Sequence, residues 1–135
     1  MKSSGWSIGE VAARFDVATS VLRHWEDAGL LDPARDAAGR RRYGIDDVTR
    51  VAIIVRSKLS GLSLDRIAMV LGSATEERQR ALEAHLADID RQMRELERWR
   101  EMTLHALECE AHDIAACPNF RRGVADVLQR LDFAA

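Results

Sequence analysis

The sequence lacks several features that would place it in common classes of protein. Its 135 residues include 2 prolines, 2 cysteines and 1 tyrosine, and aromatic residues amount to 5%. No apolar run approaches the length of a membrane span, and the N-terminal residues lack the apolar core of a secretory signal. We therefore expect a cytoplasmic protein that has no membrane partner. In such a protein an isolated pair of cysteines, Cys109 and Cys117, favours metal binding or redox sensing over a structural disulfide.

Motifs typical of enzymes are missing as well. The sequence contains no Cys-x-x-Cys redox pair, no Gly-rich phosphate-binding loop and no plausible order of Ser, His and Asp for nucleophilic catalysis. We therefore predict that the protein is not an enzyme.

What is present indicates a soluble, folding chain whose charge is unevenly distributed. Hydrophobic residues make up 47% and charged residues 31%, and the formal net charge is -2. Residues 1–71 hold 11 Lys and Arg against 9 Asp and Glu, whereas residues 72–135 hold 9 against 13. The first part also contains a run of three arginines at 40–42. Because phosphate binding depends on the face that is presented and not on net charge, this part can still bind nucleic acid.

The first part of the chain predicts two short helices joined by a tight turn. Ser7 and Glu10 have the spacing of a helix-capping box. Residues 19–28 place apolar side chains at helical spacing, and Gly29 stands where a helix end favours a left-handed residue. This arrangement is typical of a helix-turn-helix. Trp25 shares the helical phase of its apolar neighbours, so we expect it in the core.

A wing and two more helices are expected next. Residues 30–43 contain Pro33 and Gly39 and have no helical period, which predicts a two-stranded wing. Residues 46–60 and 63–71 each carry apolar residues at helical spacing and predict a third and a fourth helix.

Residues 75–109 contain no glycine and no proline, and they predict a helix roughly 50 Å long. Apolar residues recur along it at alternating spacings of four and three, which is the pattern of a coiled-coil seam. A helix of this length cannot bury its stripe against a small domain alone, so we expect an identical partner chain. The predicted dimer contacts are Leu82, Leu86, Ile89, Met93 and Leu96.

These patterns predict a mainly α fold in three parts. Residues 1–72 form a winged helix-turn-helix, and residues 73–108 form the dimerisation helix. Residues 109–135 form a short loop and a short amphipathic helix that starts at Pro118.

Three ordered blocks of sequence resemble the DNA-binding domain of MerR-family transcription regulators. They are SIGEVA at 7–12, VLRHWEDAGLL at 21–31 and GRRRY at 39–43, and the similarity continues through GLSLDRI at 61–67 into the long helix. The resemblance implies a homodimer joined by an antiparallel coiled coil. It also implies that the dimer binds and distorts promoter DNA so that RNA polymerase can engage the promoter.

The resemblance further implies which residues contact DNA. The start of the second helix reads base edges and phosphates, and the wing reaches the phosphate backbone. The resemblance implies two aromatics, commonly tyrosines, where this chain has His24 and Trp25. The residues implied in DNA binding are Thr19, Ser20, Arg23, His24, Arg41, Arg42 and Tyr43.

The segment from Cys109 to Pro118 resembles the effector loop of the copper-, silver- and gold-sensing branch of this family. Two thiolates can hold a soft monovalent ion such as Cu(I), which is the first expectation for the effector. His112 lies within the loop, and a set of Cys109, His112 and Cys117, with Asp113 as a fourth ligand, would suit Zn(II) as the second choice.

Other functions remain open at this point. Oxidation of the two thiols or an organic ligand would serve the same regulator as a switch. The two cysteines would also fit as small buried hydrophobic residues beneath the tail helix. An architectural DNA-binding protein without an effector is a further alternative, although it would need neither a long dimerisation helix nor a cysteine loop.

Overall fold

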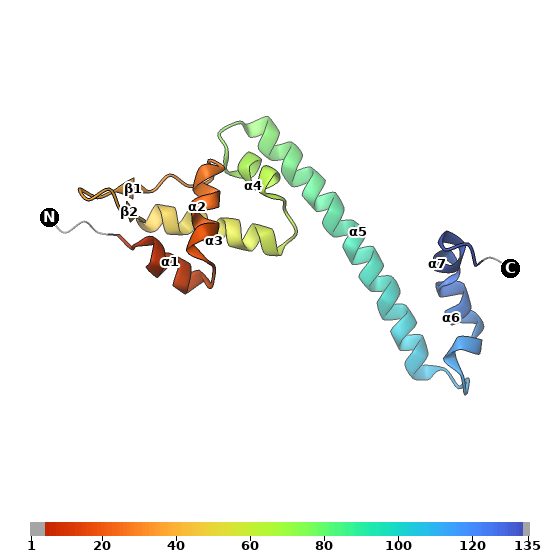
Figure 1. The fold of residues 1–135 in the computed structure, drawn as a ribbon. Helices are drawn as coiled ribbons and strands as arrows, with labels where there is room; N and C mark the ends of the chain where they lie inside the picture. The colour runs from red at the N-terminus through yellow and green to blue at the C-terminus, as the bar shows by residue number, and fades with distance from the viewer. Residues whose placement is uncertain (1–4, 134–135) are drawn as a thin grey trace. The chain divides into compact units, whose positions relative to one another are not determined.

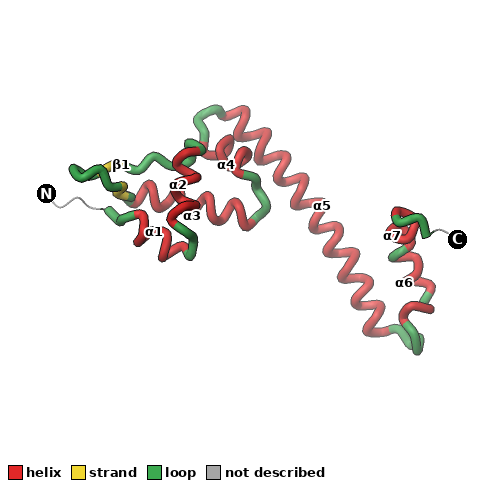
Figure 2. Tube along the Cα trace, in the orientation of Figure 1, coloured by secondary structure: helices red, strands yellow, loops and turns green. Residues whose placement is uncertain are grey.

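The computed structural model describes residues 5–133 of the chain and is mainly helical (Figure 2). Its contacts divide the chain into two compact units, one ending at His85 and the other beginning at Leu86. The longest element, helix α5 (Thr75–Glu108), contributes residues to both units. This architecture confirms the predicted fold class.

The first unit opens with α1 (Ile8–Phe15) and α2 (Thr19–Asp27), which form the predicted helix-turn-helix (Figure 1). The capping box at the start of α1 is present. The Ser7 amide donates to Glu10 Oε2 at 2.7 Å, and the Glu10 amide donates to Ser7 Oγ at 3.2 Å. The turn between the helices passes through Asp16, whose φ of 54° is left-handed. A short helix pair is thus set by local signals at its start and at its turn.

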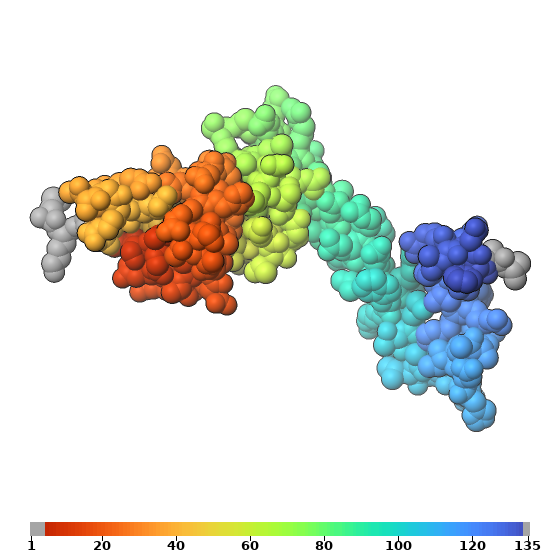
Figure 3. Space-filling view, in the orientation of Figure 1, coloured from red at the N-terminus to blue at the C-terminus, as the bar shows by residue number. Residues whose placement is uncertain are grey.

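The wing consists of two short antiparallel strands, β1 (Ala34–Arg35) and β2 (Arg41–Arg42). Its tip turns at Gly39, whose amide donates to the Asp36 carbonyl at 2.9 Å and whose φ is 77°. A backbone ladder between Trp6 and Tyr43 then ties the end of the wing to the chain before α1. The wing, coloured orange to amber, lies at the surface of the first unit (Figure 3).

Helices α3 (Ile45–Leu59) and α4 (Leu64–Leu71) follow the wing and close over the core of this unit. Ser63 caps α4 by accepting from the Arg66 amide at 3.3 Å. Trp25 is 3% exposed, as expected for a core residue. The fully buried core side chains are Tyr43, Leu22, Leu30, Ile54, Ile67, Val11 and Val51.

The second unit contains the rest of α5, a 3-10 turn at Ile114–Ala116, and the short helices α6 (Pro118–Gly123) and α7 (Ala125–Arg130). The tail thus holds two helices where the sequence predicts one. Gly123 gives little support to a helix. A Cβ at this position would lie 3.0 Å from the Met102 terminal methyl carbon, so the backbone approaches α5 closely and then bends.

Within the described residues, no helix is long and apolar enough to cross a membrane.

Candidate metal centre and DNA-binding surface

The two cysteines are brought together by the loop that joins α5 to α6. Cys109 directly follows the last residue of α5, and Cys117 directly precedes α6. Their Sγ atoms lie 3.7 Å apart. Asp113 shapes the intervening loop, because its Oδ1 accepts from the Ala115 amide at 3.0 Å. The Asp113 carboxylate therefore holds the turn of this loop. The third donor of the cluster comes from α5.

That third donor is His105. Its Nε2 lies 3.2 Å from Cys117 Sγ, and the ligand atoms of His105, Cys109 and Cys117 all lie within 4.8 Å of one another. His112, the histidine that the loop motif suggested, is exposed and does not belong to this cluster. The sequence contained a signal for His105, since it stands four residues before Cys109 and therefore on the same face of a helix.

The surroundings of the cluster favour the thiolate form of Cys117. This residue is 5% exposed, whereas Cys109 and His105 are half-buried. The Phe120 backbone amide, followed by the hydrogen bond with His105, lowers the pKa of the Cys117 thiol from 9.0 to about 7. A large part of Cys117 is then a thiolate at neutral pH, which is the form that binds metal and attacks oxidants.

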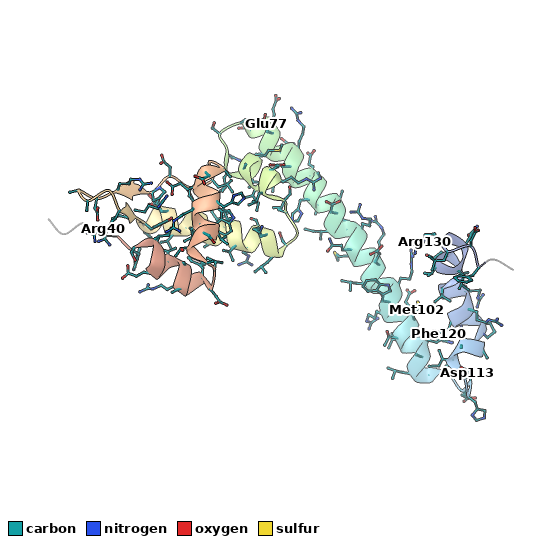
Figure 4. All side chains as sticks on the ribbon, viewed as in Figure 1. Arg40, Glu77, Met102, Asp113, Phe120 and Arg130 are labelled. Carbon is teal, nitrogen blue, oxygen red and sulfur yellow. The ribbon has the colours of Figure 1, made fainter. Side chains whose placement is uncertain are left out.

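Residues of α6 hold the His105 ring in place. The Asn119 amide nitrogen lies 3.3 Å from Nδ1 and 3.4 Å from Nε2 of His105, and Arg122 donates to Asn119 Oδ1. The Phe120 ring stands 5.6 Å from the imidazole, centroid to centroid. Figure 4 shows Met102 and Phe120 on neighbouring stretches of α5 and α6. A cavity of about 310 Å³ is lined by Glu101, Met102, His105, Asn119 and Phe120.

The predicted DNA contacts of α2 extend from its first residue, Thr19, to His24 in its last turn. Ser20, Arg23 and His24 are exposed, and Thr19 is half-buried. Ala18 stands at the N-cap of α2 and makes no side-chain capping bond. The first turn of this helix therefore has amide groups without a side-chain cap, and the exposed Arg23 follows in the next turn; both suit a ligand such as DNA phosphate.

The two arginines of β2 have different carboxylate partners. Arg41 is half-buried and pairs with Glu26 of α2. Arg42 Nε lies 3.5 Å from Asp36 Oδ2 and makes no aligned hydrogen bond there.

Tyr43, which the family resemblance placed at the DNA backbone, is fully buried in the core. Its backbone pairs with that of Trp6 just beyond the end of β2, and its ring belongs to the buried core cluster. Its hydroxyl has no hydrogen-bond partner among the described residues. Burial of the ring raises the Tyr43 pKa.

The five residues predicted to form the dimer contact lie along α5, and most of them are exposed in the single chain. Four of them are between 45% and 62% exposed, and Ile89 is half-buried. The exposed members are Leu82, Leu86, Met93 and Leu96.

Comparison with known families agrees with this architecture. Residues 6–74 match the MerR HTH family regulatory protein model, and residues 48–106 match the model described as MerR, DNA binding. The HTH-type transcriptional regulator HmrR of Rhizobium leguminosarum bv. viciae is 31% identical over 120 residues, which cover 83% of this chain and 92% of that protein. The mercuric resistance operon regulatory protein of Pseudomonas fluorescens is 35% identical over 111 residues, which cover 78% and 76%.

Solved structures show the same fold. The transcription regulator PbrR691 from Ralstonia metallidurans CH34, in complex with lead(II), has a TM-score of 0.53 and 28% identity over 83% of this chain and 94% of that one. The MerR-family regulator HiNmlR, bound to promoter DNA, has a TM-score of 0.64 at 23% identity, covering 77% and 88%. The family models and the relatives describe regulators and not enzymes. This chain belongs to the MerR family of DNA-binding transcription regulators.

Proposed function

We propose that this protein is a metal-responsive MerR regulator whose effector is a soft metal ion bound by Cys109 and Cys117. The observation that carries the proposal is the 3.7 Å separation of the two Sγ atoms at the junction of α5 and α6. Thiolate ligands select soft ions, and the lowered pKa of Cys117 favours its thiolate form at neutral pH. Regulators of similar sequence are named for mercury and for heavy metals, which supports the same class of effector.

Cu(I) is the first candidate ion, because the loop resembles the copper-sensing branch and because two thiolates suffice to hold it. Zn(II) is the second candidate, since it takes sulfur and nitrogen ligands together. The residues present fit either ion, because two sulfurs and one imidazole nitrogen lie within 4.8 Å of one another.

A bound ion would join the end of α5 to the start of α6. Two side chains in the first part of α5, Arg78 and His85, bond to the end of α4 and the end of α3. Arg78 donates to the carbonyls of Val70 at 3.1 Å and Gly72 at 2.6 Å, and His85 Nε2 lies 3.1 Å from Ser60 Oγ. The helix that leads to Cys109 is therefore also bonded to the end of α4 and to the end of α3 in the DNA-binding unit.

Native mass spectrometry of the reduced protein tests this function. The protein is offered Cu(I), Ag(I) and Zn(II) in turn, beside the double variant Cys109→Ser, Cys117→Ser. We expect stoichiometric metal on the wild type and none on the variant. If the reduced wild type retains no metal, the effector proposal fails, whereas the assignment to the MerR family does not depend on it.

Thiol oxidation is the second candidate switch, and the short Sγ to Sγ distance favours it. Peroxide would accept two electrons and two protons from the two thiols, which join as a disulfide while the peroxide is reduced to water. Oxidised protein would then lose two hydrogens in mass and regain them with a reductant. A metal site predicts instead that bound metal protects both thiols from peroxide.

A further inference from the structure

The imidazole of His105 stands beside the two thiols, outside the loop that carries them. We propose that His105 is the third protein ligand of the metal site and that His112 is not a ligand. The ion would then be held by two sulfurs and one nitrogen in a bent arrangement. This inference rests on the proposed function, because it concerns the ligands of the same site.

The distances within the cluster support a bent site. With metal–sulfur bonds of about 2.3 Å, two sulfurs on opposite sides of an ion would be about 4.6 Å apart, and two sulfurs at a tetrahedral angle about 3.8 Å apart. The observed Sγ to Sγ distance of 3.7 Å is close to the second value. His105 Nε2 lies 3.2 Å from Cys117 Sγ, near the separation of about 3.5 Å that such a site would need between nitrogen and sulfur.

The backbone that carries His105 is regular. His105 lies in the last turn of α5, and Cys109, four residues later, is the first residue after the helix; their ligand atoms lie within 4.8 Å of each other. Cys117 is fixed by the start of α6, where Pro118 occupies the first helical turn. His112, by contrast, lies in the exposed loop between the two helices.

Side chains of α6 hold the His105 ring in its position beside the thiols. Because Arg122 donates to Asn119 Oδ1, the Asn119 amide nitrogen is directed at the ring. Phe120 covers the ring at 5.6 Å and limits its rotation.

A matched pair of variants tests this inference. His105→Ala and His112→Ala are made in the full chain, and the affinity of each reduced protein for Zn(II) and for Cu(I) is measured by competition with a chelator. We expect His105→Ala to weaken binding by about tenfold or more, since even partners of ligating residues contribute that much. His112→Ala should bind as the wild type does.

X-ray absorption of the Zn(II)-loaded wild type provides a second readout. We expect two sulfur neighbours and the multiple-scattering pattern of one imidazole, and we expect that pattern to be lost in His105→Ala. His105→Gln, which retains a polar side chain of similar length, replaces this variant if the alanine chain does not keep the wild-type circular dichroism.

The outcomes separate this inference from the function on which it rests. Wild-type affinity in both His105 variants, together with loss of binding in the cysteine double variant, would overturn the role of His105 and leave the metal sensor standing. An X-ray absorption spectrum of the Zn(II)-loaded wild type with sulfur neighbours alone would likewise overturn the role of His105. Failure of the wild type to bind any of the ions would overturn both.

Discussion

Glu26, in the last turn of α2, forms an ion pair with Arg41 of the wing strand β2. The same carboxylate also lies 3.4 Å from Arg35 on β1. Glu26 of α2 therefore contacts both strands of the wing. Arg41 is thereby placed to position the wing, in addition to the phosphate contact that the family resemblance implies.

Glu26→Gln should lower the free energy of unfolding by about 1 kcal/mol, because it removes the charge that both wing arginines share. Arg41 and Glu26 are each about one-fifth exposed, so their pair is only partly screened, whereas the more exposed Arg35 contributes less. Urea unfolding of Glu26→Gln, Arg41→Ala and the double variant measures the coupling. Asp32→Asn on the neighbouring loop is the control. Additive losses in the double variant would show that the pair does not hold the wing.

Tyr43→Phe should raise the free energy of unfolding by up to about 1 kcal/mol, because it removes a buried hydroxyl that has no partner among the described residues. Tyr43→Ala should lower it by about 3–5 kcal/mol, since the ring fills the core. Thermal unfolding measures both variants.

The same Tyr43→Phe protein separates the two roles considered for this residue. A buried ring predicts that fluorescence anisotropy gives an unchanged affinity for promoter DNA. A clear loss of affinity in a stably folded variant would show that the hydroxyl reaches the DNA backbone in the complex.

The Cys117 thiol should react with iodoacetamide in a pH-dependent manner whose midpoint lies near pH 7. The Phe120 backbone amide and the His105 hydrogen bond lower its pKa from 9.0 to about 7, so the reactive thiolate accumulates as the pH rises through that value. Peptide mass spectrometry of the metal-free wild type follows the alkylation of Cys117 separately from that of Cys109, whose side chain also lowers the Cys117 pKa. His105→Ala should move the midpoint to higher pH, and an unmoved midpoint would show that His105 does not stabilise the thiolate.

Arg78→Ala should lower the free energy of unfolding by about 2 kcal/mol, because its guanidinium donates to two carbonyl groups at the end of α4, those of Val70 and Gly72. Arg80→Ala is the matched control. Its ion pair with Glu76 is highly exposed, so its loss should cost little. Equal effects of the two substitutions in urea unfolding would contradict a special role of Arg78 at the junction of α4 and α5.

The helices of this protein were predictable because their signals are local. The capping box at Ser7 and Glu10, the helical phase of Trp25 and the absence of glycine and proline along α5 act within a few residues of one another. The pairing of Cys109 with Cys117 was predictable for a similar reason, since a short loop joins them. The tail was less so, because the bend after Gly123 depends on its approach to Met102.

The sequence by itself thus determined the order of the helices, the exposed seam of α5 and the two thiols at its end. Only the tertiary structure decided that His105 and not His112 stands beside the thiols, that Tyr43 points into the core and that Arg41 pairs with Glu26. The physical reason is the same in all three cases. Each outcome depends on a contact with a segment distant along the chain. The spacing of four places His105 near Cys109, but only the folded loop brings Cys117 to it, and no periodicity records which way Tyr43 and Arg41 point.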